Sequence, residues 1–302
     1  MISKEEVLVV AAIPPELERR LTADFHLRKI RPEETETLPH RVVLTTSMAG
    51  IDADLMERLP NLELIACNGT GLERIDVDAA TARGISVCNT PNAVVDDTAD
   101  FAIGLIYATV RRLVEGDRFV RSGRWRTERM TTSRRVSSRR LGIVGLGKIG
   151  KVVAARAAAL GMEVSYTARS AKPELPYRFV GDVVDLARVV DVLILCCPGG
   201  AETANLVDAQ VLAALGPEGI LINISRGSVV DEPALIAALE ARTIAGAGLD
   251  VFAQEPEIDE RFFALPNVVL EPHYAAVTLE TRYDMADTLH AAIAAHLHSS
   301  LS

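Results

Sequence analysis

Three ionisable side chains each follow a short apolar run in the second half of the chain. Arg226 lies in LINISRGSVVDE, Glu255 in AGAGLDVFAQEP and His273 in NVVLEPHYAA. Histidine transfers protons near neutral pH, a neighbouring carboxylate favours its charged form, and arginine binds carboxylate groups. Ligands of doubly wound sheets gather at the ends of strands. Three such residues after successive apolar runs therefore indicate a catalytic cluster, whereas any one alone would indicate a surface or structural residue.

A glycine-rich turn precedes this cluster. In LGIVGLGKIGKVVAARAAALG the pattern Gly145-x-Gly147-x-x-Gly150 stands between an apolar strand and a helix. The first glycine permits a tight turn, the second lets the backbone approach a pyrophosphate, and the third lets the helix pack on the strand. The amides at the start of the helix then bind the phosphates. We predict a dinucleotide site here; the alternative is a glycine turn with a structural role only.

The residues about twenty positions further on bear on which dinucleotide binds. An NAD site usually has an Asp or Glu there, which accepts hydrogen bonds from the ribose hydroxyls. This chain has YTARS at 166–170 instead. Arg169 and Ser170 offer a cation and a hydroxyl where a 2′-phosphate would lie, so the sequence favours NADPH, with NADH as the alternative. Lys172 either adds a further charge or faces solvent.

Short apolar runs alternate with amphipathic stretches along most of the chain, the rhythm of βαβ units. The predicted strands are 7–12, 41–46, 62–66, 85–88, 141–144, 163–167, 192–196, 220–224, 245–249 and 268–270, and the predicted helices include 15–24, 53–58, 77–83, 148–160 and 232–241. The last six strands argue for a doubly wound parallel sheet. A final helix near 279–296 cannot be assigned to that sheet by pattern alone.

A different pattern separates the two series. Residues 96–123 predict a long helical stretch, because apolar positions recur at helical spacing and the first turn is acidic. Residues 123–140 then form a polar, arginine-rich arm or loop. Its basic run, Arg134, Arg135, Arg139 and Arg140, either binds an anion or belongs to a solvated loop.

Composition excludes several classes of protein. The 302 residues are 49% hydrophobic and 24% charged, which is ordinary for a globular chain of about two domains. The net charge of −9 disfavours binding of nucleic acids and of anionic membranes. The four cysteines, at 67, 88, 196 and 197, have neither C-x-x-C nor zinc-site spacing, so we expect reduced, buried thiols and no metal. No secretory start or membrane-length apolar run stands out, which predicts a cytoplasmic protein.

Five segments together resemble the D-isomer-specific 2-hydroxyacid dehydrogenase family, most closely its glyoxylate/hydroxypyruvate and hydroxyphenylpyruvate reductase branch. They are NTPNAVVDDTADFAIGL at 89–105, GIVGLGKIG at 142–150, INISRGSVVDEPAL at 222–235, GAGLDVFAQEP at 246–256 and PHYAAVTLETR at 272–282. The resemblance covers nearly the whole chain. It implies an oxidoreductase that transfers hydride between a nicotinamide and a 2-keto acid.

The resemblance also implies a role for each member of the cluster. His273 would protonate the ketone oxygen as hydride arrives, and act as the base in the reverse direction. Glu255 would hold the imidazole tautomer and raise the pKa of His273. Arg226 would bind the substrate carboxylate and polarise the keto oxygen with the same planar group.

Further binding residues follow from the same resemblance. Asn68-Gly69-Thr70-Gly71-Leu72 matches the family loop whose backbone amides bind the substrate carboxylate; without the family it would be a turn after strand 62–66. Cys197 and Pro198 would border the adenine pocket, Thr98 would lie near the nicotinamide, and Asp250 and Ala275 near its carboxamide. The remaining implied cofactor contacts are Leu146, Lys148, Ile149, Thr203, Ile224 and Ser225.

The implied architecture is α/β, with two doubly wound parallel-sheet domains of the Rossmann/flavodoxin-like type and the active site in the cleft between them. Residues 1–95, completed by 275–302, would form the substrate domain, and 96–274 the NAD(P)-binding Rossmann domain. The helix from Asp96 and the arm through Trp125 resemble the segments that build the family's homodimer interface. We therefore expect a homodimer.

One departure from the family pattern bears on the substrate. A smaller residue and a glycine commonly follow the catalytic histidine, whereas this chain has Tyr274 and Ala275-Ala276. Tyr274 either narrows the substrate pocket or packs behind it. Because only 4% of residues are aromatic, small substrates such as glyoxylate and hydroxypyruvate are favoured. The alternatives are a phenylpyruvate or hydroxyphenylpyruvate reductase, and a dinucleotide-sensing binding protein like the family's corepressors, against which the intact triad counts.

Overall fold

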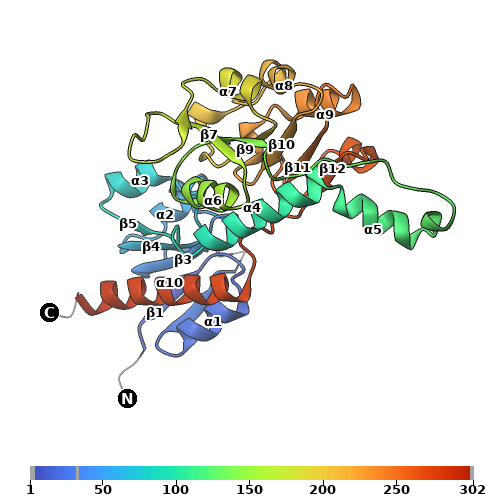
Figure 1. Cartoon of the computed structure of the whole chain (residues 1–302). Coiled ribbons are helices and arrows are strands. Elements are labelled where there is room, and N and C mark those ends of the chain that lie inside the picture. The colour runs from blue at the N-terminus through green and yellow to red at the C-terminus, as the bar shows by residue number, and fades with distance from the viewer. Residues whose placement is uncertain (1–3, 32–33, 300–302) are drawn as a thin grey trace. The chain divides into compact units, whose positions relative to one another are not determined.

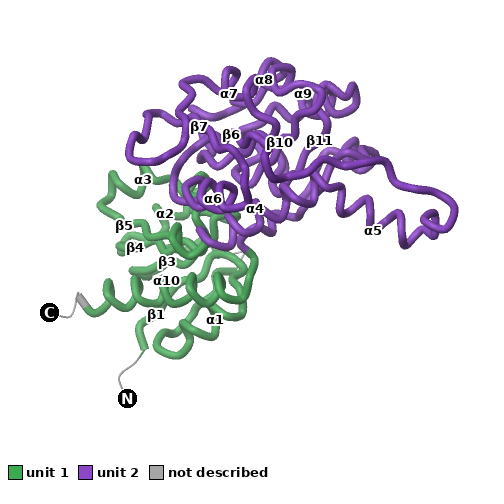
Figure 2. Tube along the Cα trace, in the orientation of Figure 1, with its two compact units in different colours: residues 1–94, 277–302 green, residues 95–276 purple. Residues whose placement is uncertain are grey.

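The computed structural model describes residues 4–31 and 34–299. Contacts divide the chain into two compact units, which are described separately (Figure 2). Unit 1 comprises residues 1–94 and 277–302, and unit 2 comprises residues 95–276. Unit 1 is therefore built from both ends of the chain, and unit 2 from its uninterrupted middle.

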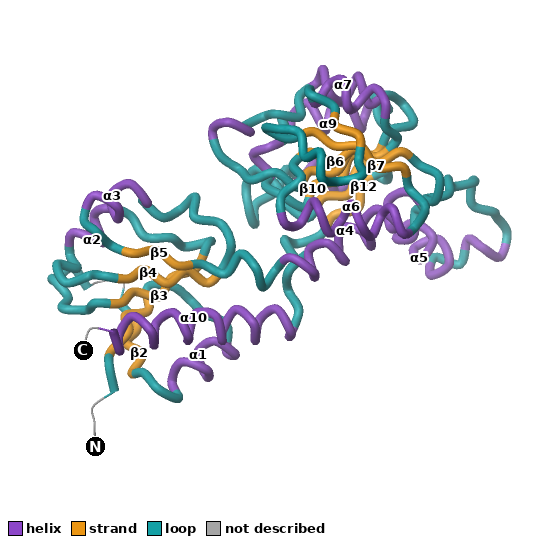
Figure 3. The backbone as a smooth tube through the Cα atoms, turned by 60° about the vertical axis from the view of Figure 1, so that its left-hand side comes forward, coloured by secondary structure: helices purple, strands orange, loops and turns teal. Residues whose placement is uncertain are grey.

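Unit 1 has a five-stranded parallel sheet at its centre (Figures 1 and 3). In spatial order its strands are β2 (His26–Lys29), β1 (Glu6–Val9), β3 (Val42–Thr46), β4 (Leu64–Asn68) and β5 (Ser86–Cys88). Helices α1 (Pro15–Thr22) and α10 (Leu279–Ser299) pack on one face, and α2 (Ala53–Glu57) and α3 (Val77–Ala82) on the other. Because both faces are covered, the central strands are almost entirely apolar.

Unit 2 contains a seven-stranded parallel sheet. Its order is β12 (Val268–Leu270), β11 (Gly246–Leu249), β10 (Ile220–Asn223), β9 (Val192–Leu195), β6 (Arg140–Val144), β7 (Glu163–Thr167) and β8 (Arg178–Phe179). Helices α4 (Val95–Val110) and α6 (Lys148–Ala159) cover one face, and α7 (Val183–Val189), α8 (Ala209–Leu215) and α9 (Glu232–Glu240) the other. The direction of strand addition reverses between β6 and β9, so the predicted doubly wound α/β class is confirmed.

Aspartate caps set the start of many helices. The carboxylates of Asp52, Asp76, Asp182, Asp208 and Asp231 each accept a backbone N–H in the first turn of α2, α3, α7, α8 and α9. Such a cap satisfies an N–H group that has no partner within the helix. No helix of the described residues has both the length and the apolar character that crossing a membrane requires.

Two short strands, β2 and β8, were not predicted from the sequence. β2 and β8 lie at the edges of their sheets, and their side chains are partly or fully exposed. Edge strands do not need the continuous apolar run that marks a strand covered on both faces. The prediction of six strands for the second series is therefore wrong by one, because β8 adds a seventh.

The predicted long helix over 96–123 is wrong as a single element. α4 ends at Val110, and α5 (Leu113–Arg121) begins after Arg112, whose φ of 55° lies in the left-handed region. Both Nε and Nη2 of Arg112 donate to the carboxylate of Glu115, so the break is held by a two-point ion pair. The apolar periodicity continues across the break, which is why the sequence pattern did not reveal it.

Short 3-10 turns complete unit 2. They are η1 (Arg124–Arg126), η2 (Ala201–Thr203), η3 (Gly227–Val229) and η4 (Glu260–Ala264). Three of them, η2, η3 and η4, lie in segments that follow β9, β10 and β11. η1 belongs to the arm after α5, which extends away from the unit 2 sheet (Figure 1).

Candidate active site

Residues singled out from the sequence follow five strands of the unit 2 sheet. His273 follows β12, Glu255 follows β11, Arg226 follows β10, Cys197 follows β9 and Gly145 follows β6. These five strands are successive neighbours in the sheet. Parallel pairing places their carboxyl ends along one edge. We call this the catalytic edge, and it combines an acid–base pair, a guanidinium and a glycine turn.

Glu255 and His273 form a hydrogen-bonded pair. Oε2 of Glu255 lies 2.7 Å from Nδ1 of His273, and Oε1 of Glu255 accepts the N–H of Phe252 at 2.9 Å. Because Nδ1 bonds to Glu255, Nε2 is the ring nitrogen that this pair leaves available to a ligand. The His273 side chain is 41% exposed and that of Glu255 18%. A ligand can therefore reach the imidazole, while its carboxylate partner is largely covered.

The pair shifts the pKa of both members. The hydrogen bond that His273 donates to Glu255, together with the negative charge of Glu255, raises the pKa of His273, against the opposing effects of burial and of Arg226. Burial opposes ionisation of Glu255, but hydrogen bonds from His273 and Phe252 outweigh it, so the pKa of Glu255 is lowered. The imidazole therefore stays protonated to higher pH than a free histidine, as a proton donor to a ketone requires.

Asp250 holds the turn that carries His273. The φ of His273 is 54°, in the left-handed region that side chains other than glycine rarely adopt. The carbonyl of Asp250 accepts the N–H of His273 at 2.9 Å, and its carboxylate accepts the N–H groups of Tyr274 at 2.6 Å and Ala275 at 3.0 Å. Asp250 is 1% exposed, and burial raises the pKa of its carboxyl. Asp250 thus accepts three backbone hydrogen bonds that hold the strained turn at His273.

Arg226 is positioned by a residue that sequence reasoning missed. Nδ2 of Asn223 donates to the carbonyl of Arg226 at 3.0 Å, and its Oδ1 accepts both the N–H and the hydroxyl of Ser225 at 3.0 Å. Asn223 ends β10 and is buried. A buried amide at the end of an apolar strand, three residues before a predicted functional arginine, is the signal that would have identified it.

Glycines allow the backbone to approach the arginine segment closely. A Cβ at Gly227 would lie 1.9 Å from the carbonyl of Phe252, and one at Gly199 would lie 2.8 Å from Cγ of Arg226. The loops after β9, β10 and β11 therefore pack against one another at the catalytic edge. The guanidinium of Arg226 donates to the carbonyl of Ser225 at 2.7 Å, and its charge acts on both Glu255 and His273.

The glycine turn has the geometry of a phosphate cradle. Gly145 has a φ of 94°, and a Cβ there would lie 2.7 Å from the backbone of Cys197; one at Gly150 would lie 2.2 Å from the carbonyl of Gly145. A Cβ at Gly147, in contrast, would meet nothing within 4 Å. Packing thus requires glycine at 145 and 150, whereas Gly147 faces open space at the start of α6. These residues fit a dinucleotide pyrophosphate on the helix N-terminus.

The segment after β7 carries the residues predicted to select the dinucleotide. Arg169 and Ser170 are exposed, and within the described residues Arg169 has no ion-pair partner. The hydroxyl of Tyr166 accepts the N–H of Lys172 at 2.6 Å, which closes this segment into a turn. Tyr166 itself is buried. Arg169 therefore follows β7, the neighbour of the strand β6 that leads into the glycine turn. No acidic residue lies at positions 168–172.

The other predicted cofactor residues have ordinary local roles. Cys197 is buried and Pro198 exposed, and the carbonyl of Pro198 accepts the hydroxyl of Thr203 at 2.7 Å. Ile224, Ser225 and Ala275 are buried at the catalytic edge. Leu146 is buried within the glycine turn, and Lys148 and Ile149 open α6. Thr98 is buried in α4, which packs against α6.

The predicted substrate loop, residues 68–72, lies in unit 1 at the end of β4. Gly69 has a φ of 142°, and a Cβ there would lie 2.3 Å from Oγ of Ser47. The carbonyl of Gly69 accepts the N–H of Thr90 at 3.0 Å, and that of Thr70 accepts Nδ2 of Asn89 at 2.8 Å. The loop is thus fixed in a conformation that only glycine adopts easily.

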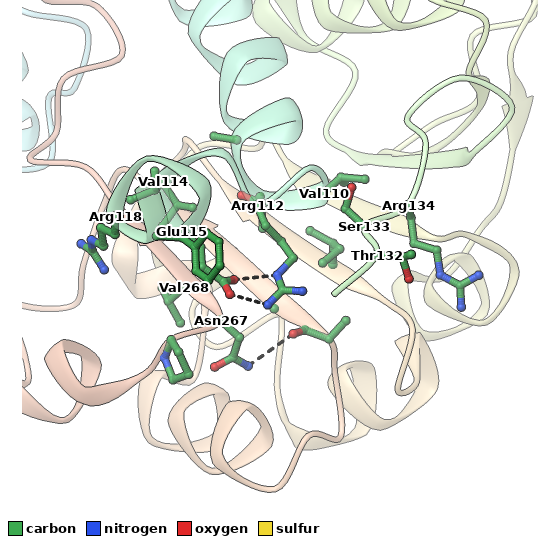
Figure 4. A pocket seen from close by; sticks show the side chains of 18 of the residues that line it. Val110, Arg112, Val114, Glu115, Arg118, Thr132, Ser133, Arg134, Asn267 and Val268 are labelled. Atoms are coloured by element: carbon green, nitrogen blue, oxygen red, sulfur yellow. Dashed lines mark hydrogen bonds and ion pairs between the residues drawn. The ribbon is translucent and has the colours of Figure 1, made fainter. Parts of the chain in front are cut away.

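A cavity of about 790 Å³ lies elsewhere in unit 2 (Figure 4). It is lined by the end of α4, by α5, by the arm and by residues that precede β10, β11 and β12. Its side chains include Arg112, Glu115, Arg118 and Arg134. None of Arg226, Glu255 and His273 lines it. The cavity is therefore distinct from the catalytic edge, which lies at the opposite ends of the same strands.

Comparison with known proteins gives consistent results. The family model described as D-isomer specific 2-hydroxyacid dehydrogenase, NAD binding domain, matches residues 103–275. A glyoxylate/hydroxypyruvate reductase of Arabidopsis thaliana is 43% identical over 297 residues, covering 96% of this chain and 95% of that protein. A hydroxyphenylpyruvate reductase of Plectranthus scutellarioides is 42% identical over 297 residues, with coverage of 96% and 95%.

Solved structures are also similar. The NADPH-dependent glyoxylate/hydroxypyruvate reductase of Sinorhizobium meliloti, in complex with NADP and malonate, has a TM-score of 0.89 at 38% identity. The match covers 95% of this chain and 92% of that one. The similarity thus extends over both units rather than over the dinucleotide-binding segment alone.

Proposed function

This chain belongs to the D-isomer specific 2-hydroxyacid dehydrogenase family of oxidoreductases, and we propose that it catalyses the NADPH-dependent reduction of glyoxylate and hydroxypyruvate. The products are 2-hydroxy acids, of D configuration where they are chiral. The observation that carries the proposal is the pair His273–Glu255 beside Arg226, on the edge that also holds the glycine turn. This combination serves proton transfer to a ketone of an anionic substrate.

His273 is the proton donor in this proposal. Its Nε2–H donates to the keto oxygen, and the proton moves to that oxygen as the carbonyl is reduced. Glu255 keeps Nδ1 protonated throughout and stabilises the imidazolium before transfer. In the oxidative direction the neutral imidazole accepts the hydroxyl proton at the same nitrogen. The buried Asp250 keeps the ring in place through the turn at His273.

Arg226 binds the substrate carboxylate and polarises its keto oxygen. A guanidinium offers parallel N–H donors that suit a planar 2-keto acid. We also propose that the backbone amides of residues 68–72 bind the same carboxylate group, which makes unit 1 the substrate domain. Gly69 and Gly71 would allow the close approach that this requires.

Unit 2 is the dinucleotide-binding domain in this proposal. Bound NADPH supplies the hydride. Gly145, Gly147 and Gly150 hold the pyrophosphate with the first amides of α6, and Arg169 with Ser170 holds the 2′-phosphate. We propose a cytoplasmic location because the four cysteines are free, as is usual in a reducing compartment.

A second candidate function is the reduction of hydroxyphenylpyruvate. The observation that favours it is the relative of Plectranthus scutellarioides, which is named a hydroxyphenylpyruvate reductase and is as similar as the Arabidopsis protein. Both candidates use the same proton-transfer residues. They differ only in the group attached to the keto carbon, so a comparison of substrates separates them.

Initial rates of NADPH oxidation test the proposal. Glyoxylate, hydroxypyruvate, pyruvate, phenylpyruvate and hydroxyphenylpyruvate are compared with NADPH and with NADH. We expect the highest kcat/KM with NADPH and a small keto acid. Higher efficiency with hydroxyphenylpyruvate would establish the second candidate. If none of the five keto acids were reduced, both candidate functions would be refuted. A dinucleotide-sensing binding protein would then best explain the glycine turn.

Replacement of Arg169 tests the choice of dinucleotide. Arg169→Ala is expected to raise the KM for NADPH by about tenfold or more and to change the KM for NADH by less than about threefold, because only NADPH carries the phosphate that the guanidinium binds. Fluorescence titration of the reduced nicotinamide gives the two Kd values independently of turnover. Arg178→Ala, an exposed arginine of β8, is the control. Equal effects on both dinucleotides would contradict the assignment.

We propose further that the chain forms a homodimer through α5 and the arm after it. Leu113, Val120 and Trp125 are 54%, 53% and 59% exposed, which is unusual for three large apolar side chains of one segment. Light scattering is expected to give twice the chain mass, and the double variant Leu113→Glu, Val120→Glu to give the monomer. Phe263→Glu, an exposed apolar residue of η4, is the control. A monomeric wild type would refute the proposal.

A further inference from the structure

Tyr274 is an exposed aromatic residue directly after the proton donor. His273 lies in the turn after β12 and has a left-handed φ of 54°. Both His273 and Tyr274 are exposed, whereas Ala275 is buried. A ligand can therefore reach Tyr274 as well as the imidazole that directly precedes it in the chain.

The position of Tyr274 is fixed although its ring is exposed. Its N–H donates to Oδ1 of Asp250 at 2.6 Å, and the next N–H, of Ala275, donates to Oδ2 at 3.0 Å. Asp250 is itself 1% exposed. The base of the tyrosine side chain is thus anchored to a buried carboxylate, so the ring extends from a defined point beside His273.

The phenol of Tyr274 is available for a ligand. The residue is 50% exposed, and within the described residues its hydroxyl makes no hydrogen bond. A tyrosine that only filled space behind the pocket would be covered, and its hydroxyl would usually find a partner. A phenol both donates and accepts hydrogen bonds. The residue therefore has the position and the chemistry of a recognition group.

We infer that Tyr274 determines substrate specificity by hydrogen bonding to a hydroxyl on C3 of the keto acid, an inference that rests on the proposed function. In this proposal the keto oxygen binds Nε2 of His273, and the substituent on the other side of the keto carbon reaches Tyr274, the next residue of the turn. Glyoxylate has no C3, pyruvate has a methyl group there, and hydroxypyruvate has a hydroxymethyl group. Tyr274 distinguishes the last of these from the first two.

The preference for hydroxypyruvate over pyruvate measures this interaction. The two substrates differ by one hydroxyl, so their ratio of kcat/KM cancels effects on the dinucleotide, on folding and on the proton donor. Tyr274→Phe keeps the ring and removes the phenol oxygen. We expect it to lower the ratio by about three- to tenfold, as loss of one neutral hydrogen bond does. Most of the change should be an increase in KM for hydroxypyruvate.

Tyr283→Phe is the matched control, because Tyr283 is also 50% exposed but lies in α10 of unit 1. Its ratio should equal that of the wild type. If the wild type is active and Tyr274→Phe leaves the ratio unchanged, the inference about Tyr274 is wrong and the proposed function stands. The same holds if Tyr274→Phe lowers kcat/KM equally for both substrates. A wild type that reduces no keto acid overturns the proposed function itself, so the two failures are distinguishable.

Discussion

Replacement of His273 by glutamine is expected to lower kcat for keto acid reduction by about a thousandfold, with the Kd for NADPH unchanged within about twofold. Glutamine has a similar reach and can still donate a hydrogen bond to a keto oxygen. It cannot deliver a proton, because its amide does not titrate near neutral pH. Single-turnover rates and fluorescence titration of NADPH measure the two quantities separately.

His26→Gln is the matched control for this prediction. His26 is also exposed, and its Nδ1 lies 2.9 Å from Oε1 of Glu6, so it repeats the histidine–carboxylate pairing of His273. It lies in β2 of unit 1 and not at the catalytic edge. We expect wild-type kcat for this variant. If His273→Gln retained more than about a tenth of the wild-type kcat, another group would have to donate the proton.

The strand ends explain why the sequence could predict that the candidate site residues lie at one edge. Arg226, Glu255 and His273 each follow an apolar run, and β10, β11 and β12 are neighbours in the sheet. A parallel sheet converts that sequence pattern into spatial proximity, because all its strands end at the same edge. The prediction needed no side-chain geometry. It required only that three runs be strands of one sheet.

The supporting contacts could not be predicted in the same way. The bonds from Asp250 to Tyr274 and Ala275 join positions far apart in sequence, and they exist because His273 adopts a left-handed φ. Periodicity does not signal that conformation, and histidine, although enriched at positive φ among residues other than glycine, adopts it rarely. The break at Arg112 has the same origin, since a left-handed residue ends α4 without any glycine or proline. Backbone strain of this kind depends on tertiary contacts.

Replacement of Glu255 by glutamine is expected to move the pH profile of reduction to lower pH. Glu255 raises the pKa of His273 through a hydrogen bond and its negative charge. Glutamine can still accept from Nδ1–H, but it carries no charge, so the pKa of His273 falls. Reduction needs the protonated imidazole and is lost as pH rises through that pKa. The variant should therefore lose about a hundredfold in kcat/KM at pH values above neutrality and less in mild acid.

The oxidative direction provides an independent check of the sign. Oxidation needs the neutral imidazole and is gained as pH rises through the pKa of His273, so in Glu255→Gln it should begin at lower pH than in the wild type. Glu232→Gln is the control: Oε2 of Glu232 accepts the N–H of Ala253 at 2.9 Å, and thus supports the same loop. A loss from Glu232→Gln equal to that from Glu255→Gln would show that the loop, and not the charge of Glu255, matters. If both profiles of Glu255→Gln stayed at the wild-type pH, Glu255 would not control the protonation of His273.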